Sequence, residues 1–262
     1  MSGDHSYNNL LKSPTNSPTD SPELQPKSSP LSSSISIISI EGNIGSGKST
    51  ILASLKSHFS KPANEHPDYN IVFLPEPLND WNKIIDNKGV PMLKKFYGDK
   101  KKYSFPFQMM AYISRLALLK KTFESKTLNS KKRTIIITER CLYTDKHIFA
   151  KMLFDDGEIE DVNYQIYLQW FETFSKDYPI QKLLYVNANA KTCLERIKKR
   201  GREGEDGISI SYLQNCNYYH ENMVRIPENC FFEQIKEIDA NVNISEILKD
   251  ENMKNIFEYI TQ

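Results

Sequence analysis

The chain has 262 residues and a formal net charge of +1, so its overall charge indicates neither a nucleic-acid nor a membrane partner. No apolar run approaches the roughly 18 residues that a membrane-spanning helix needs. Four cysteines without C-x-x-C spacing and five histidines without an H-x-x-x-H pair argue against a zinc site and a disulfide framework. We therefore expect reduced thiols in an intracellular protein.

The N-terminal segment, residues 1–34, is rich in serine and proline. It has too few apolar side chains to offset the entropy lost on ordering, so we predict a disordered tail. Its Ser-Pro dipeptides leave phosphorylation of the tail open as an alternative, and they begin at Ser13, Ser17, Ser21 and Ser29. Without arginine or an apolar stretch the segment is a poor targeting peptide, which predicts a cytoplasmic protein.

Residues 35–262 show short β-rich runs that alternate with longer amphipathic segments. This alternation predicts one α/β domain with a parallel sheet covered by helices on both faces. The β-rich runs are Ser36–Ile40, Ile71–Leu74, Thr134–Thr138, Lys182–Val186 and Ile235–Ile238.

Two long helical zones lie between these runs. The first spans Phe105–Lys121, and Ser104 before it is a suitable N-cap. The second spans Asp145–Tyr178 with an interruption near Gly157. The basic runs Lys100–Lys102 and Lys131–Arg133 are expected to solvate loops, because no aromatic residues alternate with the charges as in single-strand nucleic-acid binding.

A phosphate-binding motif follows the first β-rich run. The sequence GNIGSGKS fits G-x-x-x-x-G-K-[ST] and opens a predicted helix, Thr50–His58. Backbone N–H groups at such a turn converge on phosphate oxygens, Lys48 would reach the β- and γ-phosphates, and the hydroxyl of Ser49 would ligate Mg²⁺. The predicted nucleotide-binding residues are Gly42, Asn43, Ile44, Gly45, Ser46, Gly47, Lys48, Ser49 and Thr50. The motif predicts ATP or GTP binding but does not identify the acceptor.

Three charged residues follow the second and third β-rich runs. Glu76 lies between two prolines, and Glu139 and Arg140 end the third run. Side chains at the carboxyl ends of parallel strands meet at one edge of the sheet, so all three should lie beside the phosphate motif. A kinase must also hold an acceptor hydroxyl and help to remove its proton. Glu139 could hold Mg²⁺, and Arg140 could bind phosphate or orient Glu76. A solvated loop glutamate and a surface ion pair are the alternatives.

Two further groups of polar side chains are candidates for substrate contacts. Gln108 and Arg115 share one face of the first long helix with Ala111. A glutamine beside aromatic residues suits the edge of a planar base, although an ordinary amphipathic helix would look similar. Three arginines surround Gly201 and could stabilise phosphate charge from a mobile lid, or could solvate a helix end. They are Arg196, Arg200 and Arg202.

Together these motifs resemble the deoxynucleoside kinase family, most closely its deoxycytidine/deoxyguanosine/deoxyadenosine kinase branch. The matching pieces are EGNIGSGKST, PEP with Trp81, FQ…A..SR, TERCLYTD and CLERI..RGR, in the family's order between Ile35 and Arg225. The resemblance implies a P-loop kinase fold with a five-stranded parallel sheet and a short Arg-rich lid. It also implies nucleotide salvage, with Mg²⁺ and ATP phosphorylating a deoxynucleoside 5′-hydroxyl, and a homodimer formed through helices like 105–121 and 145–178.

The resemblance also implies roles for individual residues. Glu76 is similar to the general base, Glu139 to the metal-associated acid and Arg140 to its catalytic neighbour. Tyr97 and Glu205 match contacts to the sugar 3′-hydroxyl.

The same resemblance makes Gln108, Arg115 and Asp145 base readers, and it groups the three arginines as lid residues. Two positions depart from the family pattern. Cys141 replaces a common serine, which weakens hydrogen bonding. Gly204 replaces a common acid, which should loosen the lid around Glu205.

The choice of base depends on the predicted Arg115–Asp145 pair. A carboxylate near the base can accept a hydrogen bond from the exocyclic amine of adenine or cytosine, but it would repel the 4-carbonyl of thymine. We expect poor use of thymidine and a preference for purine deoxynucleosides, with deoxyadenosine ahead of deoxyguanosine and deoxycytidine as the alternative. A nucleoside monophosphate kinase and a non-catalytic structural subunit with this fold are alternatives of other classes.

Overall fold

The computed structural model describes residues 34–61, 68–125, 132–226 and 231–262. The predicted tail lies almost wholly outside these residues, as do Lys131 and Cys230. Five parallel strands form one sheet in the order β2-β3-β1-β4-β5. The strands are β1 (Ile35–Glu41), β2 (Tyr69–Leu74), β3 (Arg133–Glu139), β4 (Lys182–Asn187) and β5 (Gln234–Asp239). All five predicted β-rich runs are therefore confirmed, and so is the α/β class.

The centre of the sheet is apolar because β1 and β3 carry runs of isoleucine that are covered on both faces. Their register pairs Ile37 with Ile136 and Ile38 with Ile137. The edge strands β2 and β5 are only partly covered. Since every strand runs in the same direction, the loops that follow the strands gather at one edge of the sheet.

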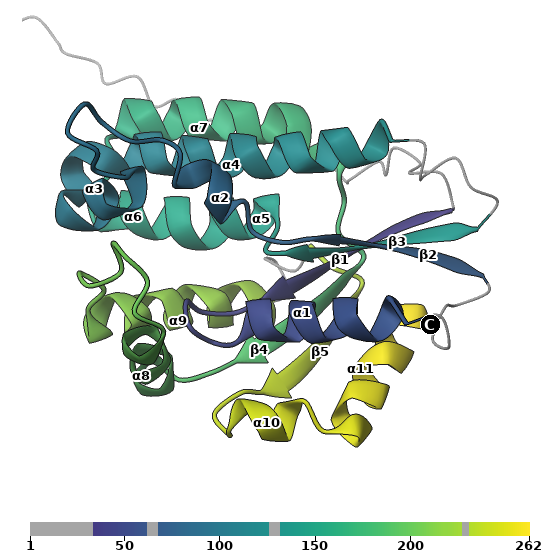
Figure 1. The fold of residues 1–262 in the computed structure, drawn as a ribbon. Helices are drawn as coiled ribbons and strands as arrows, with labels where there is room; N and C mark the ends of the chain where they lie inside the picture. Colours follow the sequence, from purple (N-terminus) through teal and green to yellow (C-terminus); the bar gives the residue numbers. More distant parts are fainter. Residues whose placement is uncertain (1–33, 62–67, 126–131, 227–230) are drawn as a thin grey trace, which may run out of the picture.

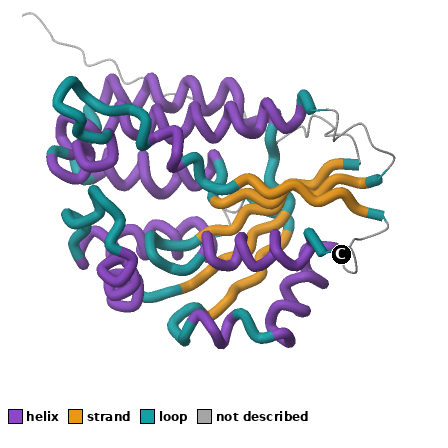
Figure 2. The backbone as a smooth tube through the Cα atoms, viewed as in Figure 1, coloured by secondary structure: helices purple, strands orange, loops and turns teal. Residues whose placement is uncertain are grey.

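Helices cover both faces of the sheet (Figures 1 and 2). They are α1 (Lys48–Phe59), α2 (Leu78–Trp81), α3 (Met92–Gly98), α4 (Lys100–Phe123), α5 (Leu142–Thr144), α6 (Lys151–Asp155), α7 (Asp161–Phe174), α8 (Ala190–Arg200), α9 (Ile210–Arg225), α10 (Ile244–Ile247) and α11 (Asp250–Thr261). A π-helical turn, η3 (Asp145–Ala150), joins α5 to α6, and a 3-10 turn, η4 (Ser175–Asp177), follows α7.

Two apolar layers hold these helices. On one face, Ile37 and Ile136 pack with Tyr112 of α4 and with Tyr167 of α7. On the other face, the sheet packs against α1 and α11, through residues such as Ile51 and Ile256. Figure 1 shows α4 and α7 side by side on the first face and α1 with α11 on the second.

The predicted start of the long helix was wrong. Helix α4 begins at Lys100, where the side chain of Asp99 accepts a hydrogen bond from the backbone N–H of Lys102 at 3.1 Å. Ser104, the expected N-cap, is buried inside the helix, and Pro106 follows it there. Both Asp99 and Ser104 are good cap residues, and only packing decides between them. The run Lys100–Lys102 therefore lies in the first helical turn and not in a loop.

The second helical zone is interrupted after α6, near Gly157, as expected. The π-helical turn inside it was not anticipated. The three described cysteines are free and buried, and the described residues include no group of three or more metal-ligating His, Cys, Asp or Glu side chains. Within the described part of the chain, no helix has the length and apolar character to cross a membrane.

Candidate active site

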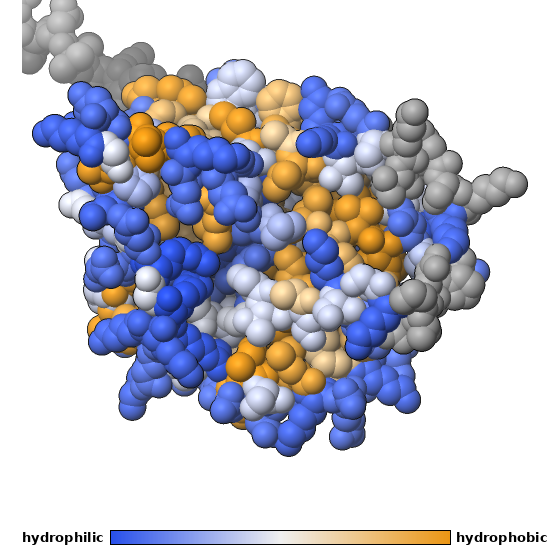
Figure 3. Space-filling model, viewed as in Figure 1, coloured by the Kyte–Doolittle hydropathy of each residue, from blue (hydrophilic) through white to orange (hydrophobic). Residues whose placement is uncertain are grey.

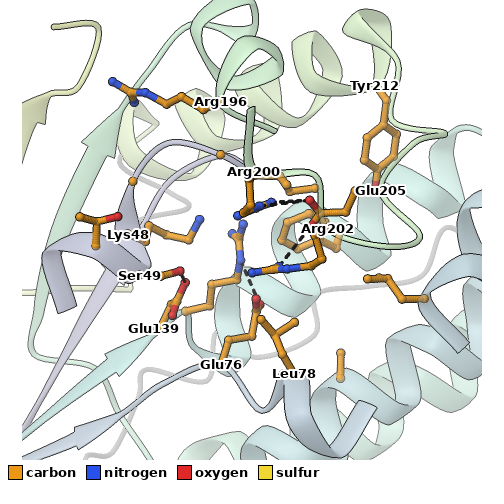
Figure 4. A pocket seen from close by; sticks show the side chains of 18 of the residues that line it. Lys48, Ser49, Glu76, Leu78, Glu139, Arg196, Arg200, Arg202, Glu205 and Tyr212 are labelled. Atoms are coloured by element: carbon orange, nitrogen blue, oxygen red, sulfur yellow. Dashed lines mark hydrogen bonds and ion pairs between the residues drawn. The ribbon is translucent and has the colours of Figure 1, made fainter. Parts of the chain in front are cut away.

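A cavity of about 660 Å³ lies at the carboxyl edge of the sheet (Figure 4). It brings together side chains from the phosphate loop, from the ends of β2 and β3, and from α3, α4, α8 and α9. Of the predicted site residues, only Gly42, Asn43 and Ser46 do not line it. The predicted neighbourhood of these residues is therefore confirmed, while the role of each remains a prediction.

The phosphate loop at one end of the cavity depends on its glycines. Gly42, Gly45 and Gly47 all have positive φ angles. A Cβ atom on Gly45 would lie 2.6 Å from the carbonyl oxygen of Cys193, so α8 packs directly on this loop. The side chain of Asn43 ties the loop to α9, because its Nδ2 donates to the carbonyl oxygen of Leu213 at 2.8 Å.

Lys48 lies buried at the start of α1, and its Nζ donates to the carbonyl oxygen of Asn43 at 2.8 Å. Burial and then the positive charge of Arg140 lower the pKa of Lys48 to about 8, although Glu139 and Glu76 act in the opposite direction. A bound phosphate would add negative charge beside this ammonium and so favour its charged form.

Ser49 and Glu139 form a pair suited to a divalent cation. The hydroxyl of Ser49 donates to Oε1 of Glu139 at 2.5 Å. One hydroxyl and one carboxylate are a small donor set, which fits Mg²⁺ because this ion keeps several waters and takes further oxygens from phosphates. The residues present therefore fit the predicted ion.

Glu76 lies between the two ends of the cavity. Its Oε1 is 3.5 Å from a guanidinium nitrogen of Arg115 and 3.5 Å from Nε of Arg140. Burial raises the pKa of Glu76, but the charges of Arg140, Arg115 and Lys48 outweigh burial and hold the pKa below its ordinary value. The carboxylate is therefore ionised at neutral pH and can accept a proton.

The backbone at Arg140 is unusual, because its φ of 65° is the only positive value among the described non-glycine residues. The turn directs the guanidinium into the cavity, where it lies over the ring of Phe149 at 4.7 Å. Such a conformation costs about 1–3 kcal/mol and persists where surrounding contacts determine it.

Aromatic rings and a charged pair form the other end of the cavity. Nε of Arg115 donates to Oδ2 of Asp145 at 3.0 Å, and another guanidinium nitrogen donates to the carbonyl oxygen of Glu139 at 2.7 Å. Gln108 is 2% exposed, and its amide has no hydrogen bond to any residue that the structure describes. The apolar lining consists of Leu78, Trp81, Leu93, Phe96, Phe107, Ala111 and Phe149. A buried amide without a partner among flat rings suits the edge of a planar base.

The lid after α8 is closed by ion pairs. Glu205 accepts from Arg200 at 2.6 Å and from Arg202 at 3.1 Å, and it is only 5% exposed. Gly204 has a φ of 87°, and a Cβ atom there would lie 3.1 Å from the backbone nitrogen of Lys94. The glycine therefore lets the lid pack closely against α3, and the expected loosening of the lid stays a prediction.

Arg196 lies apart from the other two arginines (Figure 4). Its guanidinium donates to the carbonyl oxygens of Ser46 at 2.9 Å and Val242 at 2.7 Å. Arg196 therefore contacts the phosphate loop and the loop after β5, and it is not part of the ion pairs that hold the lid. The expected group of three lid arginines is thus a pair with a separate third residue.

Two parts of the cavity were missed from sequence. Residues 241–244, after β5, line the end of the cavity that contains the phosphate loop, which we call the donor end. Tyr212 of α9 lines the cavity beside the lid. The ring of Tyr212 contacts that of Tyr97 edge-on, with centroids 6.1 Å apart. The loop could have been found, since it follows the fifth β-rich run at the same edge of the sheet. Tyr212 gave no comparable signal.

A parallel sheet with a phosphate loop, a buried carboxylate and an arginine lid around one cavity defines a P-loop kinase. The profile of the deoxynucleoside kinase family matches residues 38–262, so the chain belongs to that family and is a deoxynucleoside kinase. It is 30% identical to deoxycytidine kinase 2 of Gallus gallus over an alignment of 241 residues. The alignment covers 85% of this chain and 86% of the relative. The chain is 31% identical to deoxycytidine kinase 1 of Xenopus laevis, over 83% and 85% of the two chains. Mitochondrial deoxyguanosine kinase of Xenopus laevis is 28% identical, over 77% and 78%.

Proposed function

We propose that this protein transfers the γ-phosphoryl group of ATP to the 5′-hydroxyl of a purine deoxynucleoside. The observation that carries the proposal is a single cavity with a phosphate loop at one end, a buried amide at the other and Glu76 between them. ATP binds with its phosphates at Lys48, and the deoxynucleoside binds with its base at Gln108. The acceptor hydroxyl then lies beside Glu76, as transfer in line with the γ-phosphate requires.

In this proposal Glu76 accepts the proton of the 5′-hydroxyl, which its depressed pKa permits at neutral pH. Arg140, with Arg200 and Arg202 of the lid, neutralises charge on the transferred group. Ser49 and Glu139 hold Mg²⁺, which supplies charge neutralisation at the phosphates when it is bound.

Tyr97 and Glu205 are proposed to hold the sugar 3′-hydroxyl. Both line the cavity, and the negative charge of Glu205 is among the causes, after burial and Cys216, that raise the pKa of Tyr97. The phenol is therefore neutral and able to donate a hydrogen bond. In this proposal Glu205 exchanges part of its pairing with Arg200 for the sugar, which leaves that arginine for the phosphates.

The base is read by Gln108 and by the pair of Arg115 and Asp145. Asp145 accepts from an exocyclic amine, which disfavours thymine, and the small side chain of Ala111 leaves room for a purine. We propose deoxyadenosine as the preferred substrate, followed by deoxyguanosine. Deoxycytidine is the second candidate, because its base also carries an amine and because several relatives are named deoxycytidine kinase.

A homodimer through α4 and α7 is part of the proposal. Ile113 of α4 and Val162, Ile166 and Trp170 of α7 are exposed, and Trp170 is 46% exposed. Figure 3 shows apolar side chains along the upper edge, where these helices lie. Sedimentation of Trp170→Glu should show monomers. A control on another surface, Ile85→Glu, should sediment like the unchanged protein, and an unchanged Trp170→Glu would contradict the dimer.

A nucleoside monophosphate kinase is the weaker interpretation of the same cavity. The phosphate of such an acceptor needs a free cation beyond Glu76. Among the described residues that line the cavity beyond Glu76, the cation that could bind this phosphate is Arg115, and it is already paired with Asp145 and Glu76. A cytoplasmic location and a role in nucleotide salvage remain predictions from the sequence.

The test is an ATP- and Mg²⁺-dependent assay with deoxyadenosine, deoxyguanosine, deoxycytidine and thymidine at matched concentrations. Each 5′-monophosphate is separated by chromatography. We expect the purine deoxynucleosides to be used best and thymidine to be used worst. Thymidine as the best substrate would refute the role of Asp145, and deoxycytidine as the best substrate would select the second candidate.

A further inference from the structure

One wall of the base pocket is held by a hydrogen bond that no catalytic residue makes. Trp81, in the short helix α2, is 5% exposed and lines the acceptor end of the cavity. Its indole Nε1 donates to Oγ of Ser114 in α4 at 2.8 Å, and that hydroxyl donates to the carbonyl oxygen of Ala111 at 3.0 Å. Figure 1 shows α2 lying against α4.

The hydroxyl of Ser114 is therefore used twice. Its proton goes to a carbonyl of its own helix, which leaves its lone pair directed at the indole N–H. The two hydrogen bonds fix the position of Trp81 relative to the backbone of α4 at Ala111, the small residue that lines the pocket. Trp81 also contacts Phe107 edge-on, with 5.6 Å between the ring centroids.

The residue after Ser114, Arg115, holds the other end of the segment that carries Trp81, residues 76–81. Arg115 contacts the carboxylate of Glu76 at 3.5 Å, while Ser114 holds Trp81. Two adjacent residues of α4 thus anchor both ends of residues 76–81. This segment carries the proposed proton acceptor, Glu76, at one end and the wall of the nucleobase pocket, Trp81, at the other. The backbone hydrogen bonds of this segment, such as that from Trp81 N to the carbonyl oxygen of Pro77, are local.

We propose that Ser114 is a positioning residue that sets the width of the base pocket by fixing Trp81 against α4. The inference rests on the proposed function, because it takes the base to bind between Trp81 and α4. Without the hydroxyl, the indole N–H is left unpaired in a buried wall, and the ring moves to find another partner. Nucleoside affinity and base discrimination should then fall, while ATP binding at the far end of the cavity is unaffected.

The experiment uses tryptophan emission, because the chain has only two tryptophans. In a Trp170→Phe background the emission reports Trp81 alone. Deoxynucleoside binding is titrated by emission, and ATP binding is measured separately by calorimetry. The variants are Ser114→Ala, Ser114→Thr, which keeps a hydroxyl, and the control Thr122→Ala. Thr122 lies on the same helix and donates to the carbonyl oxygen of Leu118 at 2.8 Å, away from the cavity.

We expect Ser114→Ala to weaken deoxynucleoside binding about tenfold, to shift the emission of Trp81 and to leave the ATP dissociation constant unchanged. Ser114→Thr should restore most of the affinity, and Thr122→Ala should change nothing. In a Trp81→Phe background, followed by KM because the reporter is absent, Ser114→Ala should have no further effect.

Equal weakening of ATP and deoxynucleoside binding would indicate a general structural loss and would overturn the proposal. Unchanged deoxynucleoside binding in Ser114→Ala would overturn it as well. Failure of the proposed function has a different signature, since in that case the unchanged protein would neither bind nor phosphorylate any deoxynucleoside in the panel.

Discussion

The two ends of the cavity are built in different ways. The donor end is formed largely by consecutive residues, 42–50, whose backbone groups and glycine conformations make the phosphate loop. The acceptor end has no such segment. Its side chains come from α2, α3, α4 and the π-helical turn, and ion pairs between distant residues hold them together. Under the proposed function, phosphate binding is thus encoded by one local segment, whereas the choice of base depends on contacts between distant segments.

The two ends also differ in charge balance. Lys48 at the donor end is a cation whose pKa is lowered by burial, and hydrophilic side chains gather over α8 and the loop after it (Figure 3). At the acceptor end, Arg115 is already neutralised by Asp145 and Glu76. Substitutions at the donor end should therefore change ATP affinity, and those at the acceptor end should change specificity.

The largest effect is expected at Glu76, where the two ends meet. Glu76→Gln keeps the shape but removes the proton acceptor, so kcat should fall by about 10²–10⁴-fold. Single-turnover phosphoryl transfer measures this loss, and calorimetry should give unchanged ATP affinity. A variant that retains most of its kcat would show that another group takes the proton.

At the acceptor end, Asp145→Asn should relax the choice of base. Loss of the charged acceptor should reduce the ratio of kcat/KM for deoxyadenosine over thymidine by roughly ten- to hundredfold. The control Asp155→Asn changes an acid that pairs with the exposed Lys151, and it should leave the ratio unchanged. The account of base reading fails if both variants keep the original ratio.

Substitutions of Arg196 and of Arg200 should have different kinetic effects. Arg196 links the phosphate loop to the loop after β5, so Arg196→Met should raise the KM for ATP about tenfold and leave deoxynucleoside affinity unchanged. Arg200→Met removes a partner of Glu205 and should also weaken deoxynucleoside binding. Identical kinetic profiles for the two variants would mean that both act as lid residues.

The smallest effect concerns pH. The pKa of Glu76 is depressed because Arg140, Arg115 and Lys48 outweigh burial. Its contribution to stability should be fully present above the ordinary glutamate value of about 4.3 and be lost as pH falls from there through the depressed pKa. Carbon-13 NMR of the side-chain carboxyls, assigned with Glu76→Gln, reports the midpoint. A midpoint above the ordinary value would contradict the electrostatic account.

The elements that depend on local pattern were predictable from the sequence. The isoleucine-rich runs and the phosphate motif were found because apolar strands and closely spaced glycines are visible without knowledge of packing. Ser104 was mistaken for the cap of the long helix because Asp99 and Ser104 are both suitable N-cap residues. Helix α3 ends at Gly98, so Asp99 caps α4 directly after it, and local pattern alone could not rank Asp99 above Ser104.

Features that depend on packing were not predicted. The π-helical turn that carries Asp145 has no local signature, and the separation of Arg196 from Arg200 follows from how α8 packs on the phosphate loop. The hydrogen bond between Trp81 and Ser114 joins residues from different helices. Each of these features belongs to a contact between distant segments, and a single sequence does not show such contacts.

The most direct test of the central claim, that one cavity joins both substrates, is equilibrium binding of a bisubstrate compound. In this compound the 5′-oxygen of deoxyadenosine is linked through a chain of phosphates to adenosine. The account predicts one molecule bound per chain, with higher affinity than either half and with displacement of both labelled ATP and labelled deoxyadenosine. Displacement of ATP alone, with no gain in affinity over ATP, would contradict a shared cavity.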